Sequence, residues 1–185
     1  MEKTEVDMRS RLQRAALELF AERGYERTTA AEIAARTGVT ERTFFRHFPD
    51  KREVLFEGEA RLRTALTEAM AIVPGDTAPL DVLFQSFLSV VPLLEENRAF
   101  ALPRHAVIAA TAALREREIA KHDALAAALA EALKARGVAA LPAVLAAHTG
   151  MAAFVHATVA WLDDPSVGLG ERVELAYQAL KQLLD

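Results

Sequence analysis

The sequence predicts an all-α protein, because helical patterns follow one another along almost the whole chain. Apolar residues recur every three to four positions through most of the 185 residues, and no segment shows the strict alternation of a half-buried strand. Glycine, proline and polar capping residues separate these segments, as they do at the ends of helices. We therefore expect about nine helices, of which the first three form a small N-terminal unit.

The first helix is expected over about residues 5–23. Met8, Leu12 and Leu19 recur at helical spacing, which places their side chains on one face. Gly24 follows the last apolar residue, where a glycine commonly ends a helix.

Residues 29–48 have the pattern of two short helices joined by a tight turn. Thr29 and Glu32 have the spacing of a capping box, in which each side chain satisfies the backbone N–H of the other residue. Gly38 lies where the turn needs a positive φ, and Thr40 is the N-cap of the second helix. This is the arrangement of a helix-turn-helix, whose second helix enters the major groove of DNA while the first lies across its backbone.

The rest of the chain is expected to be helical as well. Asp50 and Glu53 have the spacing of another capping box and open a long helix. The stretch 74–79 contains two prolines and a glycine and is the clearest linker in the sequence. The expected helices cover about 50–72, 80–91, 95–110 with an interruption around Pro103, 112–135, 142–162 and 168–184.

Composition and charge exclude several classes of protein. The absence of cysteine excludes disulfides, thiolate zinc sites and thiol nucleophiles, and no His-x-x-x-His pair or glycine-rich phosphate loop occurs, so we expect no enzyme activity, metal or cofactor. The net charge is −4, yet residues 1–55 hold 11 basic and 10 acidic residues, against 11 and 16 in residues 56–185. A local basic surface is therefore compatible only with the N-terminal part. No apolar run is expected to span a bilayer and no secretion signal is evident, which predicts a cytoplasmic protein without membrane contact.

The N-terminal motif resembles a known family. The run Phe20-Ala21-Glu22-Arg23-Gly24-Tyr25-Glu26-Arg27-Thr28-Thr29, then Ile33-Ala34, Gly38-Val39-Thr40 and Phe44-Phe45-Arg46-His47-Phe48-Pro49-Asp50-Lys51, is similar to the N-terminal domain of the TetR family. The resemblance covers roughly residues 9–56 with matching spacing. It implies a ligand-responsive transcriptional regulator with a DNA-binding domain over 1–52 and a helical ligand-binding and dimerisation domain over 53–185.

The resemblance also assigns roles within the motif. Thr29 would contact a phosphate through its hydroxyl and the helix N-terminus, and Arg42 would read guanine through O6 and N7. Phe45 replaces the tyrosine that most often bonds a phosphate here, so its backbone contact stays open. His47 and Lys51 would contact phosphates. The full set of expected DNA contacts is Thr29, Thr40, Glu41, Arg42, Thr43, Phe45, Arg46, His47 and Lys51.

The C-terminal part suggests an effector site and a dimer interface. Large apolar groups on several helices are typical of pockets between helices, although an ordinary core uses the same residue types. An arginine beside a histidine would suit an acidic ligand. The expected effector residues are Phe84, Phe87, Phe100, Arg104, His105, Met151 and Phe154. The last two helices, about 142–184, are rich in alanine and leucine and would form a homodimer that places two recognition helices on a palindromic operator.

Several alternatives remain open at this stage. The favoured function is a repressor that a small, largely apolar effector releases from double-stranded DNA. An activator, or a regulator that needs its ligand to bind DNA, would have the same sequence features. An enzyme in the helical part, or a helical lipid carrier, is the remote alternative, and the spacing from Thr29 to Lys51 argues against the carrier.

Overall fold

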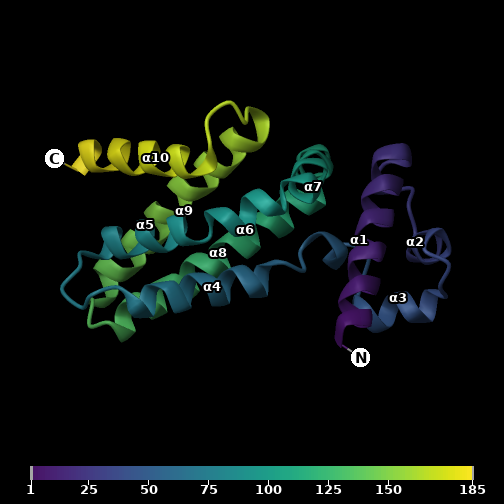
Figure 1. Cartoon of the computed structure of the whole chain (residues 1–185), viewed down its shortest axis with the longest axis horizontal. Helices are drawn as coiled ribbons and strands as arrows, with labels where there is room; N and C mark the ends of the chain where they lie inside the picture. The colour runs from purple at the N-terminus through teal and green to yellow at the C-terminus, as the bar shows by residue number, and fades with distance from the viewer. Residues whose placement is uncertain (1, 185) are drawn as a thin grey trace. The chain divides into compact units, whose positions relative to one another are not determined.

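The computed structural model describes the backbone of residues 2–184 and the side chains of residues 7–183, and within this range it contains helices and no strand (Figure 1). This confirms the predicted all-α class. The helices are α1 (Glu2–Arg23), α2 (Ala30–Arg36), α3 (Glu41–His47), the short 3-10 helix η1 (Glu53–Leu55), α4 (Glu59–Ile72), α5 (Pro79–Ser89), α6 (Val91–Glu96), α7 (Arg98–Ala110), α8 (Ala112–Ala135), α9 (Ala140–Asp163) and α10 (Leu169–Leu184).

The helices form two compact units. The N-terminal unit contains the chain up to Gly58 together with Ala99–Glu116, and the C-terminal unit contains Glu59–Arg98 and the chain from Arg117 onwards. The chain therefore passes between the two units three times. This grouping differs from a linear division between residues 52 and 53, because a segment of α7 and the start of α8 bury side chains in the core of the N-terminal unit.

The core of the N-terminal unit fixes how its three first helices pack. One face of α1 supplies Leu12 and Leu19, and α2 supplies Ile33, each of which is buried. Phe44 of α3 is fully buried among them. Ile108 and Leu114, from α7 and α8, complete the same core. Burial of a side chain of this size stabilises the fold by about 1.5–3 kcal/mol relative to leaving it in water, so these contacts determine which face of each helix turns outward.

The turns predicted from glycine are present. Gly24 ends α1 with a φ of 84°, and Gly38 joins α2 to α3 with a φ of 75°. A side chain at a positive φ is strained by its own backbone, which explains glycine at both positions.

The prediction of one long helix over residues 50–72 is wrong. Asp50 does cap the segment, because its carboxylate accepts hydrogen bonds from the backbone N–H groups of Arg52 and Glu53. The segment then forms η1 and a turn, and α4 begins only at Glu59. Val54, Leu55 and Phe56 are all buried. The backbone N–H groups of Leu55 and Phe56 donate to the carbonyl oxygens of Arg52 and Glu53 at 2.9 and 3.0 Å, which is the three-residue spacing of a 3-10 turn.

The predicted interruption around Pro103 is also wrong. Helix α7 continues through Pro103, and the break lies instead at Asn97, between α6 and α7. Pro92 occupies the first turn of α6, where its missing N–H has no helical partner to lose. Pro103, in contrast, lies within α7 without ending it.

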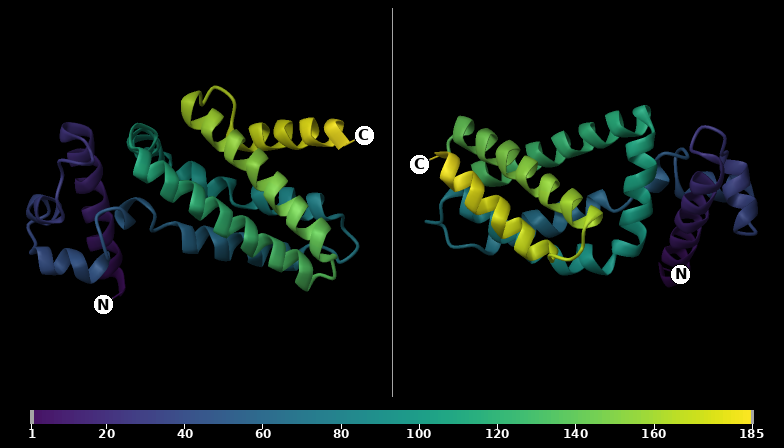
Figure 2. Two further views of the ribbon diagram at one scale, coloured as in Figure 1. Left: turned by 180° about the vertical axis from the view of Figure 1, so that it is seen from behind. Right: turned by 90° about the horizontal axis from the view of Figure 1, so that it is seen from above.

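The C-terminal unit is built around α5, α9 and α10. Phe87 of α5 stacks on Phe154 of α9, with ring centroids 4.4 Å apart, and Phe84 stacks on Tyr177 of α10 at 4.3 Å. Gly150 allows α9 to approach α5, because a Cβ there would lie 3.2 Å from the Leu83 side chain. Helix α10 contacts α9 and follows it directly in the chain, and in the rear view of Figure 2 the two helices diverge from the turn that joins them.

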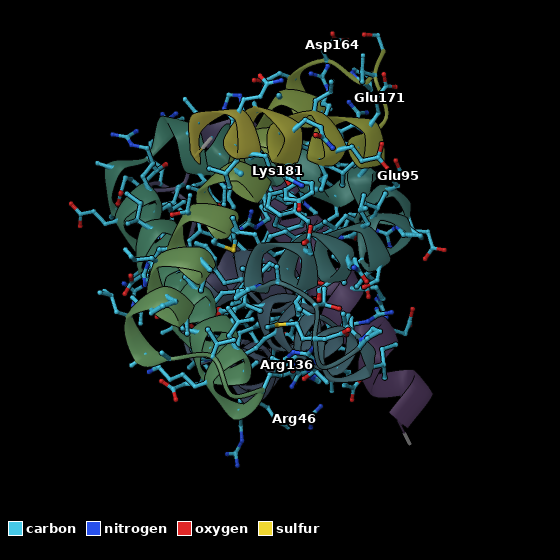
Figure 3. The ribbon with its side chains drawn as sticks, turned by 90° about the vertical axis from the view of Figure 1, so that its left-hand side faces the viewer. Arg46, Glu95, Arg136, Asp164, Glu171 and Lys181 are labelled. Atoms are coloured by element: carbon cyan, nitrogen blue, oxygen red, sulfur yellow. The ribbon has the colours of Figure 1, made fainter. Side chains whose placement is uncertain are left out.

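Arginine side chains close the ends of several helices in the C-terminal unit. Arg136, labelled in Figure 3, donates to the carbonyl oxygens of Met70, Val73 and Pro74 at 2.7, 3.0 and 2.6 Å. These carbonyls belong to the end of α4 and the turn after it, where the Pro74 carbonyl also accepts from the Thr77 backbone N–H at 3.3 Å. The stretch 74–79 is therefore a fixed turn between α4 and α5 inside one unit, and it does not separate domains.

Helix α9 corrects the expectation that no apolar segment reaches the length of a membrane span. It has 24 residues, and an 18-residue window within it has a mean hydropathy of 1.4. About a third of that window is buried within the chain, where α9 contacts α5 and α10. A core helix passes the same test of length and composition, so a single helix of this kind is weak evidence for a membrane.

Candidate nucleic-acid interface

The N-terminus of α2 is held by the predicted capping box. The Thr29 hydroxyl accepts a hydrogen bond from the Glu32 backbone N–H at 3.2 Å, and the Glu32 carboxylate accepts one from the Thr29 backbone N–H at 2.9 Å. The pKa of Glu32 lies below its ordinary value because the Thr29 backbone N–H and then the Thr29 hydroxyl donate to it, with Arg23 adding a smaller effect. Thr29 is exposed at the start of the helix, so the structure presents it to solvent.

The N-terminus of α3 is capped in a similar way. Thr40 accepts a hydrogen bond from the Thr43 backbone N–H at 3.2 Å, and the two hydroxyls lie 3.0 Å apart. Glu41 and Arg42 follow the cap and are both exposed. The first turn of α3 therefore offers hydroxyl, carboxylate and guanidinium groups in an ordered backbone.

One face of α3 is turned outward. Phe44 is buried, which leaves Arg42, Phe45 and Arg46 exposed, with Arg42 and Arg46 one helical turn apart. Figure 3 labels Arg46. Phe45 is 50% exposed and contacts only one edge of the aromatic core, because its ring meets Phe44 edge to face at 5.4 Å. An exposed phenyl ring beside two arginines is a surface suited to the apolar and anionic parts of a DNA groove.

Two of the predicted DNA contacts are less accessible. His47 is only 6% exposed, so little of its ring could meet a phosphate. The Lys51 ammonium donates to the carbonyl oxygens of Tyr25 and Thr28 at 2.9 and 3.0 Å, which come just before α2. Both side chains therefore point toward the interior of the N-terminal unit, whereas those of Arg42 and Arg46 point to solvent.

The seven predicted effector residues are divided between the two units. Phe84, Phe87, Met151 and Phe154 are buried in the C-terminal unit. Phe100, Arg104 and His105 lie on the part of α7 that belongs to the N-terminal unit, where Phe100 packs against the core.

Arg104 contacts the protein at the place where an acidic ligand was expected. Its Nε donates to the Leu55 carbonyl oxygen at 2.5 Å, and its guanidinium lies 5.1 Å from the centre of the Phe56 ring. The arginine therefore ties α7 to η1, a contact between residues 49 positions apart that a sequence pattern does not reveal.

Sequence reasoning also missed a basic hollow on α1 and α2. It has a volume of about 160 Å³ and its lining includes Arg11, Arg14, Arg36 and Thr37. Arg11 donates to the Thr37 carbonyl oxygen at 2.9 Å, while Arg36 pairs with Glu22 at 2.8 Å. A second hollow of about 460 Å³ lies between the end of α1 and the junction of α7 with α8. Neither hollow is lined by a predicted effector residue.

Taken together, a three-helix unit with two capped helix N-termini, a glycine turn and an arginine-bearing outward face defines a helix-turn-helix domain. Comparison with known proteins agrees with this class. Residues 12–57 match the model of the bacterial regulatory proteins of the tetR family. Over these residues the chain is similar to the N-terminal domain of the TetR-family regulators.

Two similar curated proteins are helix-turn-helix transcriptional regulators. The transcriptional regulator TcmR of Streptomyces glaucescens is 40% identical over 83 residues, which are 45% of this chain and 37% of that protein. An uncharacterised helix-turn-helix regulator of Mycobacterium tuberculosis is 28% identical over 109 residues, 59% of this chain and 56% of that one. The chain thus spans between about a third and just over half of the length of these curated relatives in the matched regions.

Solved structures match over most of the chain. FadR of Thermus thermophilus, a TetR-family repressor in complex with lauroyl-CoA, has a TM-score of 0.61 and 27% identity, and the match covers 93% of this chain and 92% of FadR. SmeT in complex with triclosan has a TM-score of 0.66 and 21% identity over 92% of this chain and 88% of SmeT, which shows a shared fold. TcmR and the Mycobacterium protein are named as transcriptional regulators and FadR as a repressor, in line with the expectation that the chain is not an enzyme.

The capping box leads to a first prediction. Thr29→Ala should lower the free energy of unfolding by about 1 kcal/mol, because it leaves the N-terminus of α2 without its side-chain acceptor. It should also raise the pKa of Glu32 toward its ordinary value, since the hydroxyl donor is lost and the backbone donor remains. Denaturant unfolding and an NMR titration of Glu32 would measure the two effects.

The pH dependence of this effect has a definite sign. The pKa of Glu32 is lowered in the folded state, so its contribution is present above the ordinary glutamate pKa and is lost as pH falls through the folded value. The stability difference between wild type and Thr29→Ala should therefore shrink in acid. Thr64→Ala, at an exposed position within α4, is the control. A difference that stays constant or grows on acidification would contradict the role of Glu32.

Proposed function

We propose that the chain is a transcriptional regulator that binds operator DNA as a homodimer and leaves it when a small, largely apolar effector binds. The observation that carries the DNA-binding part is the outward face of α3. Arg42, Phe45 and Arg46 are exposed there while Phe44 is buried, and the first turn is ordered by the Thr40 cap. A recognition helix needs this combination, because only an ordered helix with an exposed polar face can reach base edges.

Different residues would serve different parts of the contact. Arg42 is in the first turn of α3 and would read guanine with its planar fork. Arg46 lies one turn further on and would neutralise a phosphate, while the exposed hydroxyl of Thr29 at the start of α2 would donate a hydrogen bond to one. Thr40, Glu41 and Thr43 complete the contact region.

The experiment that tests DNA binding is its salt dependence. Affinity for random duplex DNA should fall steeply with salt, with a log–log slope of about −0.9 for each phosphate contacted. Arg46→Ala should reduce the slope by about one such contact on every sequence. Arg42→Ala should cost about 1–3 kcal/mol at a single base position of a duplex selected for tight binding.

The control for these variants is Arg63→Ala, at an exposed position of α4. It removes the same charge and should leave both the slope and the base preference unchanged. A salt-independent affinity of the wild-type protein would show that the chain is not a DNA-binding regulator. Uniform weakening by Arg42→Ala on all sequences would make Arg42 a backbone contact.

A homodimer through α9 and α10 has support in the exposed faces of these helices. Leu141, Val144 and Leu145 of α9 and Leu175 and Leu183 of α10 are exposed, with Leu145 57% and Leu175 60% accessible. Clustered apolar side chains of this kind mark interaction surfaces. A second copy of the chain is the proposed occupant, because a palindromic operator needs two recognition helices about 34–36 Å apart.

Four small residues of α9 pack inside the single chain. Ala143, Ala147, Gly150 and Ala157 are buried within the single chain, where Gly150 meets α5. They let helices of one chain approach closely, so the proposed interface consists of the larger apolar residues on the opposite side of α9.

A charged side chain introduced on the exposed apolar face of α9 tests the proposed dimer. Leu145→Glu should raise the dimer dissociation constant by roughly 100-fold or more, because two symmetry-related leucines would each lose about 1.5–3 kcal/mol of burial. Sedimentation equilibrium would measure it. Ile119→Glu, at a 67% exposed position of α8, is the matched control. Equal effects of the two variants, or none from Leu145→Glu, would place the interface elsewhere.

The effector part of the proposal concerns the aromatic core of the C-terminal unit. Phe87 and Phe154 stack across α5 and α9, with Met151 buried one turn before Phe154. Such a cluster of large apolar groups can separate around an apolar ligand, since stacked rings offer flat surfaces on both sides. The structures of FadR with lauroyl-CoA and SmeT with triclosan make an apolar compound the first candidate for this chain.

The effect of the bound effector would reach the DNA-binding helices through the segments in which the chain passes from one unit to the other. The chain passes between the units after Gly58, before Ala99 and after Glu116. On the N-terminal side, η1 is held by Arg104 of α7 and by Gln13 of α1, which donates to the Val54 carbonyl oxygen at 3.2 Å. We infer that α7 acts alongside α4 in transmission. An effector can shift the protein only by its preference for the state that does not bind DNA.

A thermal-shift experiment tests the effector. Lauroyl-CoA or triclosan should raise Tm in proportion to the logarithm of its concentration above the dissociation constant. The same compound should weaken DNA binding, and Phe87→Ala should alter its affinity. Stabilisation without any change in DNA affinity would contradict release by an effector, and tighter DNA binding would indicate the alternative in which the ligand is a co-repressor or activates transcription.

A further inference from the structure

Lys51 lies at the end of the helix-turn-helix and contacts its beginning. It follows α3 by four residues, and its ammonium donates to the Tyr25 and Thr28 carbonyl oxygens at 2.9 and 3.0 Å, with the Glu26 carbonyl oxygen at 3.5 Å. The ammonium also lies 4.2 Å from the centre of the Tyr25 ring. A lysine ammonium has three donors and no acceptor, so these three carbonyls can use its whole hydrogen-bonding capacity.

The segment that receives these bonds leads directly into α2. Thr28 is 1% exposed, and its hydroxyl donates toward the carbonyl oxygens of Leu19 and Gly24 of α1 and its end. Tyr25 is buried against Phe20, with ring centroids 5.2 Å apart. The segment 25–28 is thus fixed to α1 on one side and to Lys51 on the other, and the next residue along the chain is the N-cap of α2.

We propose that Lys51 is a positioning residue, which joins the segment before α2 to the segment after α3 and so presents Thr29 to DNA. This proposal rests on the proposed DNA-binding function and changes the role of one residue in it. A phosphate contact by Lys51 would require it to give up carbonyl partners that its ammonium already holds. The cation therefore determines where the start of α2 lies relative to α3. The phosphate contacts belong to exposed arginines such as Arg46 and to Thr29, whose hydroxyl would exchange its one hydrogen bond to Glu32 for one to the phosphate.

The first test uses Lys51→Met, which keeps the length of the side chain and removes its charge and donors. Its Tm should fall by roughly 6 °C or more, as expected for the loss of two charge-assisted hydrogen bonds in a chain of this length. The salt slope of DNA binding, measured well below Tm, should stay within error of wild type. The control Arg52→Met removes the neighbouring exposed charge, which pairs with Asp50, and should lower Tm by less.

A double-mutant cycle distinguishes positioning from general destabilisation. If Lys51 acts through Thr29, the losses in DNA affinity from Lys51→Met and Thr29→Ala should be strongly non-additive, because the second change removes a contact that the first has already misplaced. The pair Arg52→Met and Thr29→Ala should be additive. A Lys51→Met protein with unchanged Tm and a salt slope reduced by about 0.9 would overturn the proposal, as would full additivity with Thr29→Ala.

A second test measures the rate of lysine acetylation, first in the free protein and then with duplex DNA present. Acetylation of the free protein, followed by mass spectrometry, should modify Lys51 at least tenfold more slowly than the lysine introduced by Arg46→Lys on the exposed face of α3. Adding duplex DNA should protect that introduced lysine and leave the rate at Lys51 unchanged. Rapid acetylation of Lys51 in free protein with protection by DNA would overturn the proposal. Absence of protection at both positions, with slow acetylation of Lys51, would instead count against DNA binding through α3 while leaving the carbonyl contacts of Lys51 intact.

Discussion

The burial of Phe44 is the constraint on which the proposed DNA-binding surface depends. Phe44 is fully enclosed by the core that α1 and α2 form, and this fixes the rotation of α3 about its own axis. When one large side chain of a helix is packed in a core, the side chains on the opposite face of that helix must point to solvent. The exposure of Arg42, Phe45 and Arg46 is therefore a consequence of packing, and the Thr40 cap then fixes where their helix begins.

The second constraint is the way in which polar side chains tie distant segments of the N-terminal unit together. Lys51 holds the segment before α2, Gln13 holds η1 from α1, and Arg104 holds η1 from α7. Each donates to a main-chain carbonyl, so each fixes backbone position without requiring a particular side chain at the acceptor. Hydrogen bonds from charged groups to carbonyls are worth about 1.5–3 kcal/mol, which is enough to hold short irregular segments that have few backbone bonds of their own.

Segment 53–58 contributes to the core of the N-terminal unit and also connects that unit to α4. Val54, Leu55 and Phe56 are buried side by side in the N-terminal unit, and α4 of the C-terminal unit begins immediately afterwards. A continuous helix over 50–72 would have transmitted any rotation of α4 rigidly to the end of α3. The observed 3-10 turn instead makes the connection through a short segment that α1 and α7 both hold, which is why we assign α7 a part in transmission.

The sequence by itself determined the all-α class, the helix-turn-helix and its two caps, since Thr29, Glu32, Gly38 and Thr40 act through neighbours within a few positions. Local hydrogen bonds and a positive φ depend on near neighbours in the chain, so their residues are visible as a pattern. Only the tertiary structure decided which side chains face outward and which hold the backbone together. The surroundings of His47, Lys51 and Arg104 could not be predicted from the sequence, because burial and carbonyl partners 23 to 49 residues away are set by packing.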